Sequence, residues 1–177
     1  MAAVERTVVV GTAPRSDAAV VALAVVSLVW LGALLGVSFL ATPVKFLAPT
    51  LTMPVALDVG RQTFHWFNRI EIALAVAALV VAVAYDRPRL LDNVGTAVRP
   101  YATLLAAVLA VAVGLQALWL LPLLDARVET IIQGGTPPPS SLHDVYVVLE
   151  AVKLGALVGA AWLAVAAMRR GAPRLDG

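Results

Sequence analysis

Nine polar or ionisable side chains stand inside otherwise apolar stretches of the sequence, and their types could support chemistry. They are His65, Asn68, Arg69, Glu71, Gln116, His143, Tyr146, Glu150 and Lys153. The last four follow one another at i, i+3, i+7 and i+10, which predicts one stripe along an α-helix. His65, Asn68 and Arg69, continued by Ile72, predict a second stripe on another helix. If these two helices are neighbours, a polar pocket lies between them.

The polar set is compatible with a metal or a cofactor. Histidine and carboxylate ligands suit a divalent metal such as zinc, and the candidate ligands are His65, His143, Glu71 and Glu150. Two histidines on different helices could also hold a haem axially, as in a membrane oxidoreductase. Against a metal, the sequence has no His-x-x-x-His or Glu-x-x-His pair, and two cations lie nearby. No soluble catalytic signature is present, so a non-enzymatic protein is expected, and an oxidoreductase stays open as an alternative.

Other interpretations need no cofactor. Glu71 with Lys153, or Arg69 with Glu150, could neutralise each other across the bundle, and such a buried pair can be purely structural. A glutamate in a poorly hydrated site could instead carry protons, which a nearby cation opposes. These alternatives stay open at the level of the sequence.

The elements that must position these residues are membrane-spanning helices. The chain is 61% hydrophobic and 14% charged, with a mean hydropathy of +0.91. Its four apolar runs reach the roughly 20 residues that a bilayer crossing requires, and backbone groups in lipid must pair within a helix. The predicted spans cover residues 18–42, 64–85, 101–124 and 142–168. We therefore predict an all-α integral membrane protein, a four-transmembrane-helix bundle over residues 18–168, with tails 1–17 and 169–177.

Basic residues predict the orientation of the bundle. Eight arginines fall in the two tails and the second connection: Arg6, Arg15, Arg87, Arg89, Arg99, Arg169, Arg170 and Arg174. Four basic residues belong to the other side: Lys45, Arg61, Arg69 and Arg127. Both termini are therefore predicted to be cytoplasmic, and the polar pocket to lie in the outer half. The arginine-, alanine- and valine-rich composition is typical of a GC-rich bacterial genome, so a multi-pass protein of the inner (plasma) membrane is expected.

The composition of the chain and its glycine motifs indicate which partners it could have. The chain has no cysteine, which excludes disulfides and thiolate metal sites. Its net charge is only +2 and its basic residues form no patch, so nucleic-acid binding has no support. Gly32-x-x-x-Gly36 and Gly155-x-x-x-Gly159 allow close backbone approach in lipid. These motifs predict contact between the first and fourth helices, or alternatively between two copies of the chain.

Three short stretches resemble the transmembrane protein 205-like family of small four-helix membrane proteins, which is similar to the membrane domain of copper-resistance protein D. The stretches are residues 36–46, residues 60–68 and Leu142-His143 after a charged loop. The resemblance implies a four-helix fold and a link to metal or drug tolerance. Copper(I) prefers soft ligands, and the chain has no cysteine and only three methionines. A group resembling anthrone oxygenases is nearly as compatible.

The function predicted from the sequence is that of a small polytopic protein that binds a small polar ligand or ion, such as a metal ion, in the pocket or passes it through. The alternatives are an accessory or structural subunit of a larger membrane complex and an oxidoreductase with haem or metal. The expected surroundings are the lipid bilayer, other membrane subunits or a second copy of the chain.

Overall fold

The computed structural model describes residues 17–92 and 100–171, and in these ranges the chain is helical with four elements long and apolar enough to cross a membrane. The first crossing comprises α1 (Asp17–Leu34), the π-helix η1 (Leu35–Ala41) and α2 (Thr42–Lys45). The second is α3 (Met53–Asp92). The third comprises α4 (Tyr101–Leu115), the π-helix η2 (Gln116–Leu120) and α5 (Leu121–Ile132), and the fourth is α6 (Leu142–Gly171). The predicted all-helical fold with four helices able to span a membrane is confirmed, although these helices are longer than the apolar runs.

The predicted boundaries differ most for the second crossing. Residue 64 was the expected start, but α3 begins at Met53, with Pro54 in its first turn. Proline is tolerated there because the first N–H groups of a helix have no intrahelical acceptor. Hydropathy reports only the stretch that suits lipid, so it missed the polar helical turns before residue 64. The tail 1–16, the connection 93–99 and residues 172–177, which carry part of the arginine count, lie outside the described residues.

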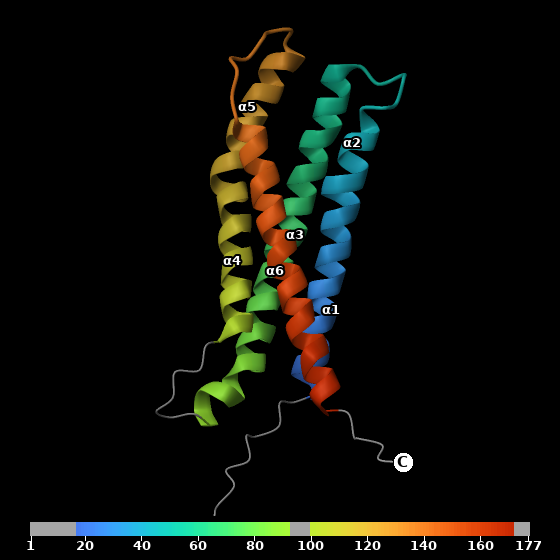
Figure 1. Ribbon diagram of the computed structural model, residues 1–177. Coiled ribbons are helices and arrows are strands. Elements are labelled where there is room, and N and C mark those ends of the chain that lie inside the picture. Colours follow the sequence, from blue (N-terminus) through green and yellow to red (C-terminus); the bar gives the residue numbers. More distant parts are fainter. Residues whose placement is uncertain (1–16, 93–99, 172–177) are drawn as a thin grey trace, which may run out of the picture.

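The four crossings run alternately up and down, and both ends of the described chain lie at the same end of the bundle (Figure 1). We call that end the terminal end, and the end formed by connections 46–52 and 133–141 the distal end. The first crossing packs against α3 and α6, and α4 packs against the same two helices. The second and fourth crossings therefore occupy opposite corners. The expectation that a pocket forms between two neighbouring helices, α3 and α6, is corrected: their polar stripes meet across the centre of the bundle.

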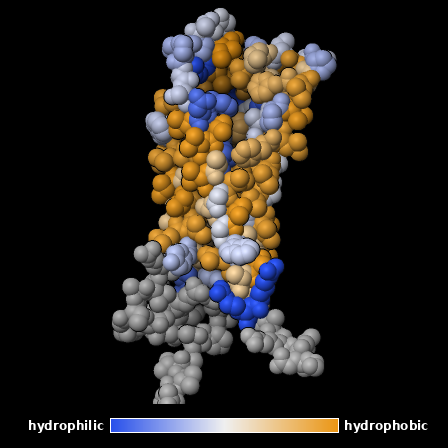
Figure 2. Space-filling view, in the orientation of Figure 1, coloured by the Kyte–Doolittle hydropathy of each residue, from blue (hydrophilic) through white to orange (hydrophobic). Residues whose placement is uncertain are grey.

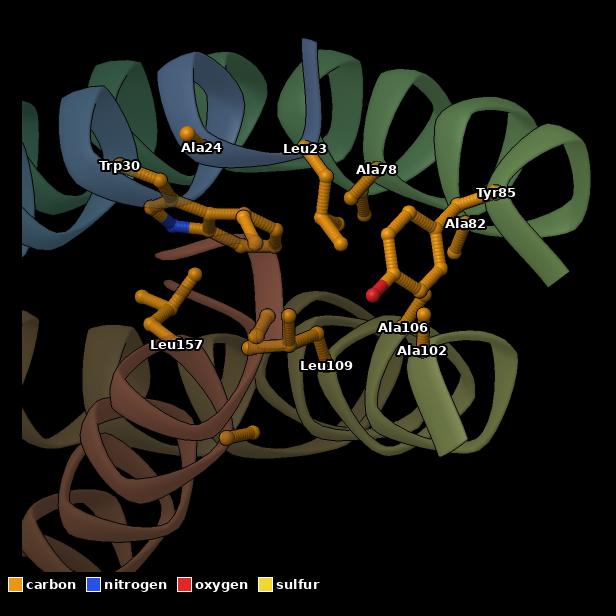
Figure 3. Close-up of a cluster of buried hydrophobic side chains, with 14 of the residues drawn as sticks. Leu23, Ala24, Trp30, Ala78, Ala82, Tyr85, Ala102, Ala106, Leu109 and Leu157 are labelled. Atoms are coloured by element: carbon orange, nitrogen blue, oxygen red, sulfur yellow. The ribbon is translucent and has the colours of Figure 1, made fainter. Parts of the chain in front are cut away.

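On the face shown in Figure 2, hydrophobic side chains cover most of the middle of the bundle, and hydrophilic side chains gather toward the distal end. Inside, alanines at helical spacing let the helices approach closely, among them Ala75, Ala78 and Ala82 on α3 and Ala156, Ala160 and Ala164 on α6. Larger side chains fill the centre: Trp30, Tyr85, Leu109 and Leu157 all point into the same interior (Figure 3). Small residues replace the hydrophobic drive that helix association lacks in lipid.

The glycine motifs do not make the predicted contact between the first and fourth helices. A Cβ built on Gly32, Gly36 or Gly155 would meet nothing within 4 Å, and one on Gly159 would meet Leu105 of α4. The inward stripe of α6 runs through Ala156, Ala160 and Ala164, so its glycines fall beside that stripe. The alanines therefore provide the close approach that the glycines were expected to provide.

Two π-helical segments interrupt the first and third crossings in the same way. Each ends two residues before a proline, Pro43 after η1 and Pro122 after η2. Proline has no N–H, so the preceding turn widens and i→i+5 bonds form, from Thr42 N–H to Val37 O and from Leu121 N–H to Gln116 O. Such widened turns often occur at functional sites. Both segments border the polar interior described next.

Candidate functional site

The centre of the site is a set of buried polar side chains from all four crossings, which we call the buried cluster: Trp30, Glu71, Gln116, Glu150 and Lys153. The Lys153 Nζ donates to both carboxylate oxygens of Glu71 at 2.6 and 2.8 Å, and lies 2.7 Å from Glu150 Oε1. Trp30 Nε1 donates to Glu71 Oε1 at 3.0 Å, and Gln116 Nε2 donates to Glu150 Oε1 at 2.7 Å. One ammonium is therefore held between two carboxylates in the interior.

The cluster lies nearer the distal end than the terminal end. Along α6, Glu150 is eight residues from the distal start at Leu142 and twenty-one from Gly171, and along α3, Glu71 is eighteen residues from Met53 and twenty-one from Asp92. Gln116 begins η2, so the widened turn presents its amide to Glu150. The π-helix thus positions one of the cluster's hydrogen-bond donors.

The stripe predicted on the second crossing is partly wrong. Phe67, Asn68 and Glu71 are buried, whereas Arg69 and Ile72 are exposed. At 3.6 residues per turn, His65 lies about 120° around the helix from Glu71, so the two cannot share one inward face. On α6 the predicted stripe is closer to the structure, because Tyr146, Glu150 and Lys153 are all buried.

A cavity of about 360 Å³ lies between the first and fourth crossings and extends to Glu150 of the buried cluster. Its lining residues are Ser38, Phe39, Thr42, Pro43, Phe46, Phe64, His143, Tyr146, Val147 and Glu150. Glu150 is 2% exposed, and its Oε2 has no hydrogen-bond partner of good geometry among the described residues, although the Tyr146 hydroxyl lies beside this carboxylate. Ser38 Oγ, on η1, is also buried without a partner there. Two unpartnered oxygens therefore belong to side chains that line this cavity.

The remaining predicted site residues lie outside the cluster. Arg69 is exposed, with its guanidinium 4.7 Å from the centre of the Trp66 ring, so the expected Arg69–Glu150 pair does not form, whereas Glu71–Lys153 does. His65 Nε2 lies 2.6 Å from Asp125 Oδ2 on α5. His143 is exposed at the start of α6 and lines the mouth of the cavity.

Replacing His65 with alanine is expected to cost less than about 1 kcal/mol of stability, because the His65 and Asp125 side chains are 41% and 28% exposed. Unfolding of the purified protein by SDS in mixed micelles, followed by far-ultraviolet circular dichroism, measures this change. Asp125→Ala is the matched partner variant, and the double variant should cost no more than either single one. A loss of several kcal/mol for His65→Ala would contradict this description of the pair.

The structure does not bring the four candidate metal ligands together. Glu71 is bonded to Lys153, and His65 is bonded to Asp125. Within residues 17–92 and 100–171, no three histidine, cysteine, aspartate or glutamate side chains gather in a group that could hold a metal ion. In the described protein, the arrangement at Glu150 therefore suits hydrogen bonding and charge pairing better than metal coordination.

Sequence reasoning missed Trp30 and Asp86. Trp30 has 0% exposure, and a buried indole N–H requires an acceptor, so an indole in the middle of the first run was an available signal. Asp86 is 1% exposed; its Oδ2 accepts the Thr103 N–H at 2.8 Å and the Thr103 hydroxyl at 2.9 Å. It thereby caps the first turn of α4 from the neighbouring helix, a role that no local spacing reveals.

Comparison with known proteins gives one family. The model described as "Domain of unknown function (DUF4149)" matches residues 25–130, from α1 to α5. No curated protein and no solved structure matches the chain. The match includes Trp30, Glu71 and Gln116 but ends before Glu150 and Lys153. Since it covers more than half of the chain, this multi-pass membrane protein belongs to the DUF4149 family, whose function is unknown.

Proposed function

We propose that this protein binds a small ligand or ion inside the membrane, in the cavity that reaches Glu150. The observation that supports the proposal is the buried Glu150 Oε2, which has no hydrogen-bond partner of good geometry among the described residues and belongs to a side chain that lines a cavity of about 360 Å³. Small-molecule sites are typically apolar cavities of this size with a few polar groups.

The rival reading is that the cluster is purely structural. The charge of Glu71 alone suffices to neutralise Lys153, and Trp30 donates a further hydrogen bond to Glu71. A second carboxylate adds an uncompensated negative charge and therefore raises the cost of burial. This excess is understandable if Glu150 serves a ligand. A structural role for Glu71 and Lys153 is compatible with a binding role for Glu150.

The test is chemical access to Glu150. An apolar carbodiimide, dicyclohexylcarbodiimide, should modify Glu150 in the detergent-purified protein at mildly acidic pH, whereas Glu71, with both oxygens bonded to Lys153, should stay unmodified. Peptide mapping by mass spectrometry locates the adduct, and Glu150→Gln is the control that removes it. If Glu150 stays unmodified while the exposed Glu129 reacts, or if Glu71 reacts equally, the cavity does not admit small molecules and the proposal fails.

We also propose the orientation with both termini in the cytoplasm of a bacterial cell, supported by the arginine count. The distal end, with Arg61 and Asp125, then faces outward, and the cluster lies in the outer half of the membrane. A relationship to the transmembrane protein 205-like family is proposed on the three sequence stretches alone. Neither proposal is needed for ligand binding at Glu150.

A further inference from the structure

The buried cluster has an unbalanced charge. Two carboxylates, Glu71 and Glu150, share one ammonium, Lys153, so the ionised set carries a net charge of −1. In the part of the chain that the structure describes, no further cation forms a salt bridge with any of the three. An isolated buried charge is costly and either binds a counter-ion or takes up a proton. The cavity at Glu150 is therefore a place where a positive ligand would be stabilised.

The walls of the cavity are aromatic. Phe39, Phe46, Phe64 and Tyr146 line it, and the Phe64 and Tyr146 rings meet edge to face with their centroids 5.0 Å apart. The negative faces of aromatic rings attract organic cations. Among the described residues, Glu150 is the only acidic one that lines this cavity, and neither lysine nor arginine lines it. A small metal cation would need several oxygen ligands, whereas a weakly hydrated alkylammonium suits apolar walls with one carboxylate.

The protein already places an ammonium of its own against two of these rings. Lys45 Nζ lies 5.1 Å from the centre of the Phe46 ring and 5.7 Å from that of Phe64. It occupies the space that a side chain at Gly60 would fill, in a neighbouring cavity that shares Phe46, Phe64 and His143. Lys45 thus shows that these rings accommodate an ammonium. It would also repel a second cation in the adjoining cavity.

We propose that the cavity binds a monovalent organic ammonium ion, with the ammonium at Glu150 Oε2 and its apolar groups against the aromatic walls. The inference rests on the proposed function, that the cavity admits small ligands to Glu150. It adds the sign of the ligand's charge and its chemical class. The nearest alternative is a neutral molecule that donates a hydroxyl to Glu150, and the experiment separates the two.

The experiment compares three probes of similar shape on the full-length protein in mild detergent: benzyltrimethylammonium, its neutral carbon analogue neopentylbenzene, and phenylacetate. Isothermal titration calorimetry measures binding, and protection of Glu150 from the carbodiimide reports where the probe binds. Only the cation should bind and protect. Glu150→Gln should weaken its binding roughly 30-fold or more, because a buried charge partner is lost. Lys45→Met should strengthen it by about threefold to tenfold by removing a nearby repulsion.

The outcomes distinguish the two proposals. Carbodiimide labelling of Glu150 without protection by the cation leaves the cavity accessible but overturns the ammonium assignment. Equal binding of the neutral analogue, unchanged by Lys45→Met, identifies a neutral ligand and also overturns it. Absence of labelling overturns the proposed function itself. If Glu150→Gln fails to fold, Lys45→Met still tests the proposal, because this variant is expected to bind the cation more tightly. Unchanged or weaker cation binding by Lys45→Met contradicts the proposal.

Discussion

Replacing Lys153 with methionine is expected to destabilise the protein by about 3–5 kcal/mol, because it leaves two buried carboxylates without their cation. Lys153 is fully buried and holds Glu71 and Glu150 through contacts of 2.6 to 2.8 Å. Methionine keeps the length and much of the volume of the side chain, so the loss reports charge rather than packing. SDS-induced unfolding in mixed micelles, followed by circular dichroism, measures the change.

The matched control is the double variant Glu71→Gln/Lys153→Met. Glutamine keeps an acceptor for Trp30 Nε1 while it removes the charge, so the cluster then contains one carboxylate instead of two without a cation. Removing both members of a buried pair is often far less costly than removing one. The double variant should therefore recover at least half of the lost stability. With the single variant Glu71→Gln measured as well, a loss in the double variant equal to the sum of the two single losses would show that Glu71 and Lys153 are not energetically coupled.

Replacing Trp30 with alanine is expected to cost about 3–5 kcal/mol, since it opens a large cavity where the four crossings meet. Trp30 is the largest of the fully buried side chains that the structure describes, and it packs in the interior shared with Leu157 and Leu109 (Figure 3). Its Nε1 also donates to Glu71 Oε1. The same unfolding measurement on Trp30→Phe separates the contribution of packing from that of the hydrogen bond to Glu71.

Phenylalanine at position 30 keeps most of the ring volume but loses the N–H, so Trp30→Phe should cost only about 1–2 kcal/mol. Trp162→Ala is the matched control, because that indole is 66% exposed and its loss should change stability by about 0.5 kcal/mol or less. Losses of equal size at Trp30 and Trp162 would contradict the inward position of Trp30. A loss for Trp30→Phe as large as for Trp30→Ala would place the whole effect in the hydrogen bond.

Much of the candidate site could be predicted from residue type. A glutamate, a glutamine or a lysine in an apolar run must find a polar partner, so Glu71, Gln116, Glu150 and Lys153 were expected in the interior. Helical spacing placed Tyr146, Glu150 and Lys153 on one side of α6 correctly. The same reasoning failed for Arg69, because an arginine two residues from Glu71 lies on another side of α3 and stacks on Trp66 instead.

The amino-acid sequence by itself determined that the chain crosses a membrane four times as helices, because hydropathy and backbone pairing in lipid depend on local composition alone. Only the tertiary structure decided that α3 and α6 stand at opposite corners and that alanines rather than glycines form the helix contacts. It also decided that Lys153 contacts both glutamates, whereas Trp30 donates to Glu71 and Gln116 donates to Glu150. Helical periodicity specifies which residues share a face. Which face meets which helix depends on how all four helices fill one interior, and no single segment contains that information.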